Sequence, residues 1–318
     1  MTDIALTPED ASALDAGAPL SGRPANKPRG GHAAPTRKVV IYRTKVWVRI
    51  WHWINALSLF FLLVSGLQIF DAHPSLYWGQ IATFEHPILA MRAFPQGDSF
   101  RGVTFLFGHP FRTTGFLGAS EYNGHLVSRG FPSWMTIPGN RDLEGGRRWH
   151  FFFAWIFAIN GALYFAYILI SRHLRGDLWP SFAELKQIPR SILDHILFRH
   201  PEGAAAAKFN VLQKLAYLAV LLGLLPLMIL TGLTMSPGMD AAFPVLPFAF
   251  GGRQSARTIH FLCAWSLVGF FAIHIFEVFA AGVFNEMRSI ITGRFTIKFP
   301  VEPEPSPPPS ALAPGASE

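Results

Sequence analysis

The sequence predicts an all-α integral membrane protein, in which four transmembrane helices form a bundle and a large outer loop joins the first two. Three observations predict this fold class. Of the 318 residues, 50% are hydrophobic and only 15% are charged, a balance that a soluble domain of this length does not need. Four apolar stretches are each long enough to cross a bilayer, which requires about 20 residues. Aromatic and basic residues gather at their ends, as interfacial anchors do.

The predicted spans cover roughly residues 49–70, 149–171, 211–235 and 258–283. Glu277 is the only acidic residue within them, and Pro226 in the third predicts a kink rather than a helix end. The chain then divides into three parts. These are a disordered extension (1–40), a membrane domain (41–299) and a disordered proline-rich tail (300–318).

Basic residues predict the orientation of the spans. Lysine and arginine cluster before the first span and between the second and third, which places both segments and the two termini in the cytoplasm. Residues 71–148 then form the outer loop. The first 40 residues lack the apolar core and cleavage site of a signal peptide. The net charge of +7 is an orientation signal, and we expect no nucleic-acid binding because no compact basic domain exists.

Cysteine and histidine usage limits the possible redox centres. Cys263 is the only cysteine, which excludes a disulfide, a cysteine-linked haem and an iron–sulfur cluster held by this chain. His260 and His274 lie 14 residues apart in the fourth span, within about 40° on one helix face and about 21 Å apart along it. That spacing suits two stacked haems. The alternative is two core histidines that are hydrogen-bonded to protein groups.

Topology groups the histidines of the spans into two levels. His150 opens the second span level with His260, and His52 opens the first span level with His274. We interpret them as ligands of two haems b, with His150 and His260 near the outer face and His52 and His274 near the inner face. His173 is an alternative to His52, although its position suits an interfacial side chain better.

These residues resemble a known family. The run Val48-Arg-Ile-Trp-His52-Trp-Ile-Asn55, the histidine opening span two and the His-x13-His spacing of span four resemble the di-haem cytochrome b subunits of formate dehydrogenases, nickel-iron hydrogenases and thiosulfate reductases. The resemblance covers all four spans and implies the same four haem ligands. It also implies location in the bacterial cytoplasmic membrane and electron exchange between the quinone pool and a periplasmic redox partner. That partner is expected to be a molybdenum-cofactor oxidoreductase or its electron-transfer subunit.

Two further sets of residues are candidates for cofactor contacts. Arg49, Arg148 and Arg257 lie near the expected haems and are placed to bind propionates, although each also suits a membrane anchor.

The start of the third span carries the second set, Asn210, Gln213 and Lys214. The resemblance implies a quinone pocket at this N-x-x-Q-K sequence, and the two amides share one helix face. The alternative is that Asn210 caps the helix and Lys214 reaches the membrane interface.

The outer loop combines many aromatic residues with arginine, which is typical of a protein-docking surface. The alternative is a small folded cap that uses the aromatics as its core.

The chain carries no hydrolase, metalloprotease or nucleotide-binding motif, so chemistry on the terminal substrate is assigned to another chain. The predicted function is a membrane cytochrome b subunit, with quinone reductase or quinol oxidase activity as part of a complex. The alternatives are a freestanding di-haem quinone oxidoreductase that reacts with a small diffusible molecule, and a haem-free anchor or transporter.

Overall fold

The computed structural model describes residues 36–171, 179–197 and 210–300. The chain divides into two compact units. The larger comprises Lys45–Leu193 and Phe209–Val283, and the described part of the smaller comprises residues 36–44, 194–197 and 284–300. The predicted tail beyond residue 300, most of the predicted N-terminal extension and His173 lie outside the described residues.

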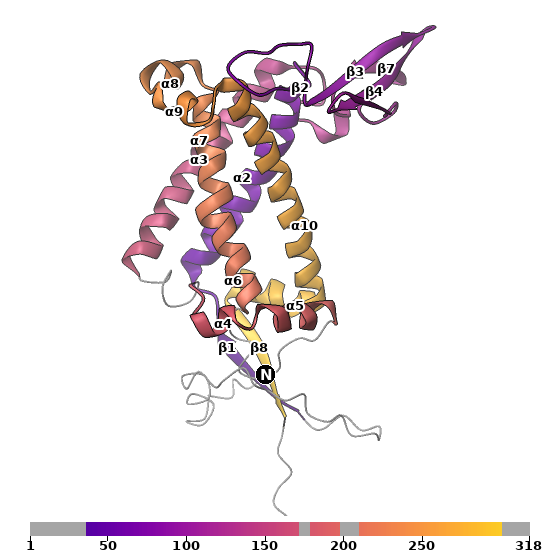
Figure 1. Ribbon diagram of the computed structural model, residues 1–318. Coiled ribbons are helices and arrows are strands. Elements are labelled where there is room, and N and C mark those ends of the chain that lie inside the picture. Colours follow the sequence, from indigo (N-terminus) through magenta and orange to yellow (C-terminus); the bar gives the residue numbers. More distant parts are fainter. Residues whose placement is uncertain (1–35, 172–178, 198–209, 301–318) are drawn as a thin grey trace, which may run out of the picture. The chain divides into compact units, whose positions relative to one another are not determined.

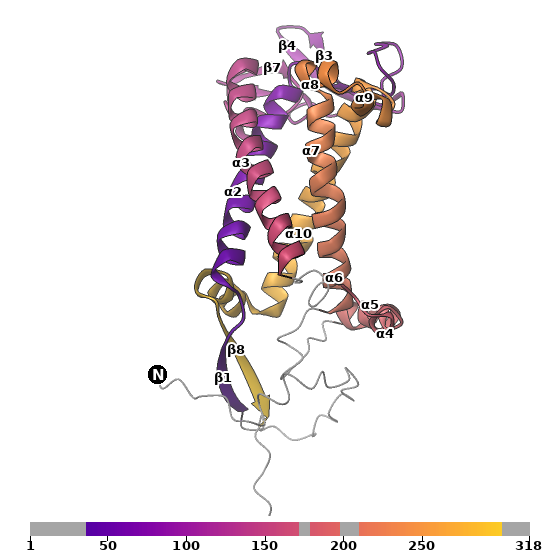
Figure 2. The ribbon, with the colours of Figure 1, turned by 90° about the vertical axis from the view of Figure 1, so that its left-hand side faces the viewer.

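Within the described residues, four helical segments are long and apolar enough to cross a membrane (Figure 1). They are α2 (Val46–Phe70), α3 (Leu143–Ile170), the segment Val211–Thr234 and α10 (Arg253–Thr292). Their most apolar windows have mean hydropathies of 1.8 to 2.2, and each overlaps a span predicted from the sequence. Figure 2 shows α2 and α3 side by side along their lengths.

The third apolar segment is not a uniform α-helix. It consists of α6 (Val211–Leu218), the π-helical η4 (Ala219–Leu224) and α7 (Leu225–Thr234). Pro226 is the second residue of α7, just after the π-helical segment. Proline lacks an N–H and its ring crowds the carbonyl of the preceding turn, so a wider turn relieves the clash and the helix continues.

The prediction of an all-α fold is wrong, because the predicted outer loop is a folded β-rich cap. We use "the cap" for residues 71–142, which lie at one end of the four apolar helices (Figure 1). One antiparallel sheet has the order β2-β3-β4-β5, and β6 pairs with β7 in a second. The strands are β2 (Ser75–Leu76), β3 (Leu89–Gln96), β4 (Ser99–Leu106), β5 (His109–Arg112), β6 (Gly118–Tyr122) and β7 (His125–Arg129), followed by the short helix η1 (Ser133–Met135).

Two-residue turns explain why these strands pair as hairpins. Asn123 and Gly124 join β6 to β7 with φ of 52° and 80°, and Phe107 and Gly108 join β4 to β5 with φ of 47° and 81°. Positive φ at both central residues defines the type I′ turn, whose twist matches that of the flanking strands. Asn-Gly is the strongest sequence signal for such a turn, so the β6–β7 hairpin was detectable from sequence.

Apolar packing joins the cap to the end of α2. Leu67 and Phe70 of α2 form a buried cluster with Leu76, Met91 and Phe131 of the cap. These five side chains are no more than 6% exposed. Part of the predicted alternative is thus correct, since some aromatics of this segment form its own core.

Short helices occupy the remaining connections. These are α4 (Phe182–Leu185), α5 (Ile188–Ile196), α8 (Pro237–Ala242) and α9 (Val245–Ala249), and the last residues of α5 belong to the smaller unit. The helix α10 contains one non-helical residue, Gly282, with φ of 108° and ψ of 86°, next to the boundary between the two units. Residues with a side chain rarely adopt that conformation, so glycine permits the break.

The smaller unit contains an antiparallel strand pair and the end of α10. Strand β1 (Thr36–Tyr42) pairs with β8 (Arg294–Pro300), with Val39 opposite Ile297. Arg43 forms an ion pair with Glu286 at 3.2 Å and lies 4.4 Å from the ring centroid of Phe295. Residues 36–40 of the predicted N-terminal extension therefore belong to a strand.

Candidate functional site

The structure brings His150 of α3 and His260 of α10 together near the cap. Their ring centroids are 6.3 Å apart and their planes are inclined by 60°. Farther from the cap, His52 of α2 and His274 of α10 form a second pair with ring centroids also 6.3 Å apart and planes inclined by 55°. We call these the cap-side pair and the distal pair. Both groupings are those predicted from topology.

The donor set of these pairs fits a haem iron. Each pair supplies two imidazoles, and no group of three or more His, Cys, Asp or Glu side chains suited to a metal occurs within the described ranges. A zinc site takes three or four protein ligands, whereas a haem iron receives four nitrogens from its porphyrin and needs only axial ligands. Metal–nitrogen bonds of about 2 Å on each side place two axial ring centres roughly 6 Å apart.

Hydroxyl groups hold the two histidines of the cap-side pair. Ser65 Oγ lies 3.1 Å from His150 Nδ1, and Thr231 Oγ1 lies 3.0 Å from His260 Nδ1. The sequence interpretation missed both hydroxyls, because each comes from a different helix than its histidine. The signal that was present is the matching pair of dipeptides, Ser65-Gly66 and Thr231-Gly232.

The distal pair has a different environment. His52 Nδ1 is buried and lacks a hydrogen-bond partner among the residues that the structure describes, as do Asn55 Oδ1 and Ser58 Oγ on the following turns of α2. Buried polar atoms are nearly always paired in folded proteins. Three such atoms along one apolar helix are therefore consistent with a polar group that binds between the helices.

Comparison with known proteins identifies the family. The model of the prokaryotic cytochrome b561 family matches residues 43–293, which include all four histidines. The chain belongs to this family. A protein of Azospira oryzae, described as putative protein-methionine-sulfoxide reductase subunit YedZ1, is 26% identical over 231 residues, which is 72% of this chain and 86% of that protein. No solved structure matches the chain.

Membership of the cytochrome b561 family establishes the general character of this chain. It is a membrane cytochrome b, an integral membrane protein that binds haem b and is associated with oxidoreductase chemistry. The expected resemblance to a membrane-anchoring cytochrome b subunit is confirmed at this level.

The three arginines predicted to bind propionates differ in their contacts. Arg49 lies one turn before His52, and its role stays a prediction. Arg148 is exposed and pairs with Glu144 on the same helix. Arg257 donates to the His73 carbonyl and lines an opening of about 280 Å³ one turn before His260. That opening is lined by Gln80, Met235, Arg253, Gln254 and Arg257.

At the start of α6, the predicted quinone residues form a capping box. Asn210 Oδ1 accepts from the Gln213 N–H at 2.9 Å, and Gln213 Oε1 accepts from the Asn210 N–H at 3.2 Å. Lys214 Nζ lies 2.7 Å from Glu184 Oε1 of α4. The capping role is therefore observed, and it uses the oxygen atoms of both amides. The quinone role stays a prediction.

The Glu184 carboxylate links α4 to α6 and also caps α4. Burial raises the pKa of Glu184, but hydrogen bonds from Lys214 and Ser181 outweigh burial and lower the pKa below its ordinary value. A carboxyl whose pKa is lowered by folding stabilises the fold at neutral pH. This contribution is lost as the pH falls through the lowered pKa.

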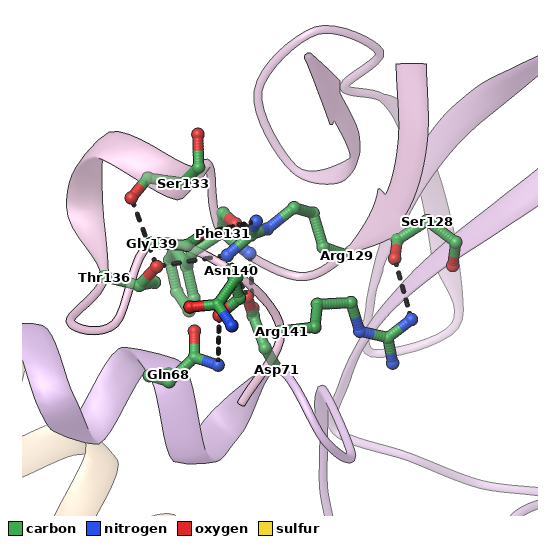
Figure 3. Close-up of polar contacts among 10 residues, drawn as sticks. All are labelled: Gln68, Asp71, Ser128, Arg129, Phe131, Ser133, Thr136, Gly139, Asn140 and Arg141. Carbon is green, nitrogen blue, oxygen red and sulfur yellow. Dashed lines mark hydrogen bonds and ion pairs between the residues drawn. The ribbon is translucent and has the colours of Figure 1, made fainter. Parts of the chain in front are cut away.

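A buried polar network fixes the cap to the end of α2 (Figure 3). Arg129 Nη2 lies 3.2 Å from Asp71 Oδ2, and the two side chains are 1% and 2% exposed. Asp71 also accepts from the Phe131 N–H at 2.7 Å, and Arg129 donates to the Gly139 carbonyl at 2.9 Å. Gln68 of α2 donates to the Asn140 carbonyl at 2.9 Å.

Burial and the hydrogen-bond partners of Asp71 have opposite effects on the pKa of its carboxyl group. Burial raises the pKa of Asp71, against the opposing effects of the Phe131 N–H and the Arg129 guanidinium. The network connects the cap to the turn of α2 that follows Ser65.

Proposed function

We propose that this cytochrome is a di-haem electron-transfer subunit that connects a periplasmic redox partner with the quinone pool. The observation that carries the proposal is the presence of two histidine pairs, each with ring centroids 6.3 Å apart, at two levels along α10. His150 and His260 would hold one haem, and His52 and His274 the other. Haem b held by two imidazoles supplies one-electron transfer.

The chain's own residues would arrange this path. Helix α10 contributes one histidine to each pair, so it fixes the spacing between the two sites. All four histidines are half-buried on helices that are apolar enough to cross a membrane. Two sites along one helix would allow electrons to cross most of the bilayer in steps.

The cap is the proposed docking surface for the partner, and the cap side is the proposed periplasmic face. Phe107 is 72% exposed at a turn position with φ of 47°, where Asn or Gly fits better than an aromatic residue. Trp134 is 76% exposed and lies 6.3 Å from Phe116, centroid to centroid. Exposed aromatics of this kind dominate protein interfaces.

The partner is proposed to be a molybdenum-cofactor oxidoreductase or its electron-transfer subunit. Support comes from the relative in Azospira oryzae, whose description makes it a putative subunit of a reductase. A subunit acts with another chain, and the cap provides a surface where another chain is able to bind.

The purified chain is expected to contain two haems b that titrate as separate one-electron centres. Haem extraction gives the ratio of haem to protein, and reduced-minus-oxidised spectra give the coordination. A quinol should reduce both haems in the absence of the partner. A ratio of one haem, or a high-spin spectrum, would contradict the proposal.

Asn210 and Gln213 are proposed to donate their amide N–H groups to a quinone carbonyl near the distal pair. Capping uses their oxygens, whereas a quinone carbonyl needs donors, so capping does not in itself exclude the quinone role. The double variant Asn210→Ser, Gln213→Glu keeps a capping box but removes both amide donors. Two lost hydrogen bonds of about 1 kcal/mol each should weaken quinone binding about thirtyfold.

Quinone-dependent reoxidation of the reduced haems measures this effect. The control is Asn210→Ala, Gln213→Ala, which removes the capping box and should also lower thermal stability. If the Ser/Glu variant keeps normal quinone affinity with both haems bound, the quinone site lies elsewhere.

A further inference from the structure

Ser65 and Thr231 contact the two cap-side histidines in the same way, although they belong to different helix pairs. We propose that their hydroxyls are positioning groups that hold His150 and His260 as Nδ1–H tautomers, so that both rings present Nε2 to one iron and its reduction potential is lowered. This inference rests on the proposed binding of haem at the cap-side pair.

The number of protons available on each hydroxyl supports the Nδ1–H tautomer of both histidines. Ser65 Oγ donates to the Phe61 carbonyl at 2.5 Å, and Thr231 Oγ1 donates to the Leu227 carbonyl at 2.6 Å. A hydroxyl has one proton, and in both residues a backbone carbonyl receives it. Each hydroxyl oxygen is therefore able only to accept a hydrogen bond from the histidine Nδ1 atom. The ring nitrogen that faces it must therefore carry the hydrogen. The other nitrogen, Nε2, is left with its lone pair for a metal.

Glycine next to each hydroxyl lets the ring approach the neighbouring helix. A Cβ atom at Gly66 would lie 3.3 Å from His150 Cε1, and one at Gly232 would lie 3.5 Å from His260 Cε1. The first distance is tighter than ordinary van der Waals contact. Each imidazole is thus held at one edge by a hydroxyl and beside it by bare backbone, which limits rotation of the ring.

The repetition of this arrangement separates it from an ordinary packing contact. The pair α2 and α3 supplies Ser65, Gly66 and His150, and the pair α7 and α10 supplies the corresponding Thr231, Gly232 and His260. Two helix pairs would thus build two matching halves of one metal site. His52 in the distal pair lacks such a partner for its Nδ1 within the described part of the chain.

The expected electronic effect follows from ligand chemistry. An imidazole that donates a hydrogen bond from its outer nitrogen is a more basic metal ligand. A more basic ligand favours ferric over ferrous iron, so it lowers the reduction potential. Removing either hydroxyl should therefore raise the potential of the cap-side haem and leave that of the distal haem unchanged.

The test uses single variants made in a His274→Ala background, where only the cap-side haem is expected to remain. Ser65→Ala and Thr231→Ala should each shift its midpoint potential to a more positive value, with a larger shift when both are combined. Ser65→Thr and Thr231→Ser keep a hydroxyl and should restore the original potential. Electron paramagnetic resonance of the ferric haem should also change in the alanine variants, because its g values depend on the relative orientation of the two imidazoles.

Helix α7 provides a matched control. Thr234 is 0% exposed, and its hydroxyl donates to the Leu230 carbonyl at 2.8 Å. The Thr234 hydroxyl shows no contact with a histidine of the cap-side pair in the described structure. Thr234→Ala should therefore leave the potential and the g values unchanged.

The possible outcomes separate a failure of the positioning role from a failure of the proposed haem site. If Ser65→Ala and Thr231→Ala keep haem with an unchanged potential and spectrum, the positioning role is refuted and haem binding stands. If they lose haem while Ser65→Thr, Thr231→Ser and the Thr234→Ala control keep it, the role is supported. If the Thr234→Ala control loses haem equally, the role is refuted. If the His274→Ala chain with both hydroxyls intact binds no haem, the proposed cap-side site itself fails.

Discussion

Replacing His260 with alanine should reduce the haem content of the chain from two to one and leave the distal haem in place. Haem b has no covalent link to the protein, so coordination and packing alone retain it. His274→Ala should have the opposite selectivity, with loss of the distal haem. Haem extraction with reduced-minus-oxidised spectra of each variant measures the result. His150→Ala and His52→Ala should match His260→Ala and His274→Ala, respectively.

His73 provides the control for these variants. It lies in the cap, where its ring is 5.8 Å from the Tyr77 ring centroid and does not face a second histidine in the described structure. Burial lowers the pKa of His73, and nearby Arg257 adds to this effect. His73→Ala should keep both haems. If His260→Ala or His274→Ala retained two low-spin haems, the pairing would be wrong, and loss of a haem in His173→Ala would favour that residue over His52.

Replacing Arg129 with methionine should destabilise the cap by about 3–5 kcal/mol, because Asp71 would remain buried without its ion-pair partner. The change also removes the hydrogen bonds to Gly139 and Phe131. Hydrogen exchange of the β3, β4, β6 and β7 amides should rise sharply. Both haems should remain, since their ligands lie on the helices.

Two other variants sharpen this experiment. The double variant Asp71→Asn, Arg129→Met removes the stranded charge and should recover part of the lost stability. Phe107→Asn changes an exposed residue at a turn where Asn is favoured, so exchange of the cap should stay unchanged while partner affinity falls. A loss below about 1 kcal/mol in Arg129→Met would contradict a supporting role for the ion pair.

The apolar helices were predictable because a bilayer imposes length and hydropathy on every span. A folded cap was considered as an alternative, but its β-strands were not recognised for two physical reasons. Its strands β3 and β4 contain Pro95, Gly102 and charged residues, which weaken the alternating pattern of a half-buried sheet. The Phe107-Gly108 turn also has no favourable turn residue at its first position, although Asn123-Gly124 did carry the hairpin signal.

The histidine groupings were predictable because helix periodicity and membrane topology together fix depth along each span. The hydroxyl contacts were not predictable in this way. Ser65 and His150 are 85 residues apart, and their contact depends on how α2 and α3 rotate against each other. The amides of Asn210 and Gln213 illustrate a different limit, since one sequence pattern suits both a helix cap and a quinone contact.

The π-helical turn between α6 and α7 has a consequence for the phase of the third apolar helix. A π-helical turn accommodates one residue more than an α-helical turn, so every residue beyond it is rotated by about 100° relative to an uninterrupted α-helix. Gln213 lies before this turn, and Thr231 lies after it. The angular offset between the capping box at one end and the His260 contact at the other is therefore set by Ala219–Leu224. A one-residue deletion there would keep the helix apolar and continuous, yet turn Thr231 away from the histidine.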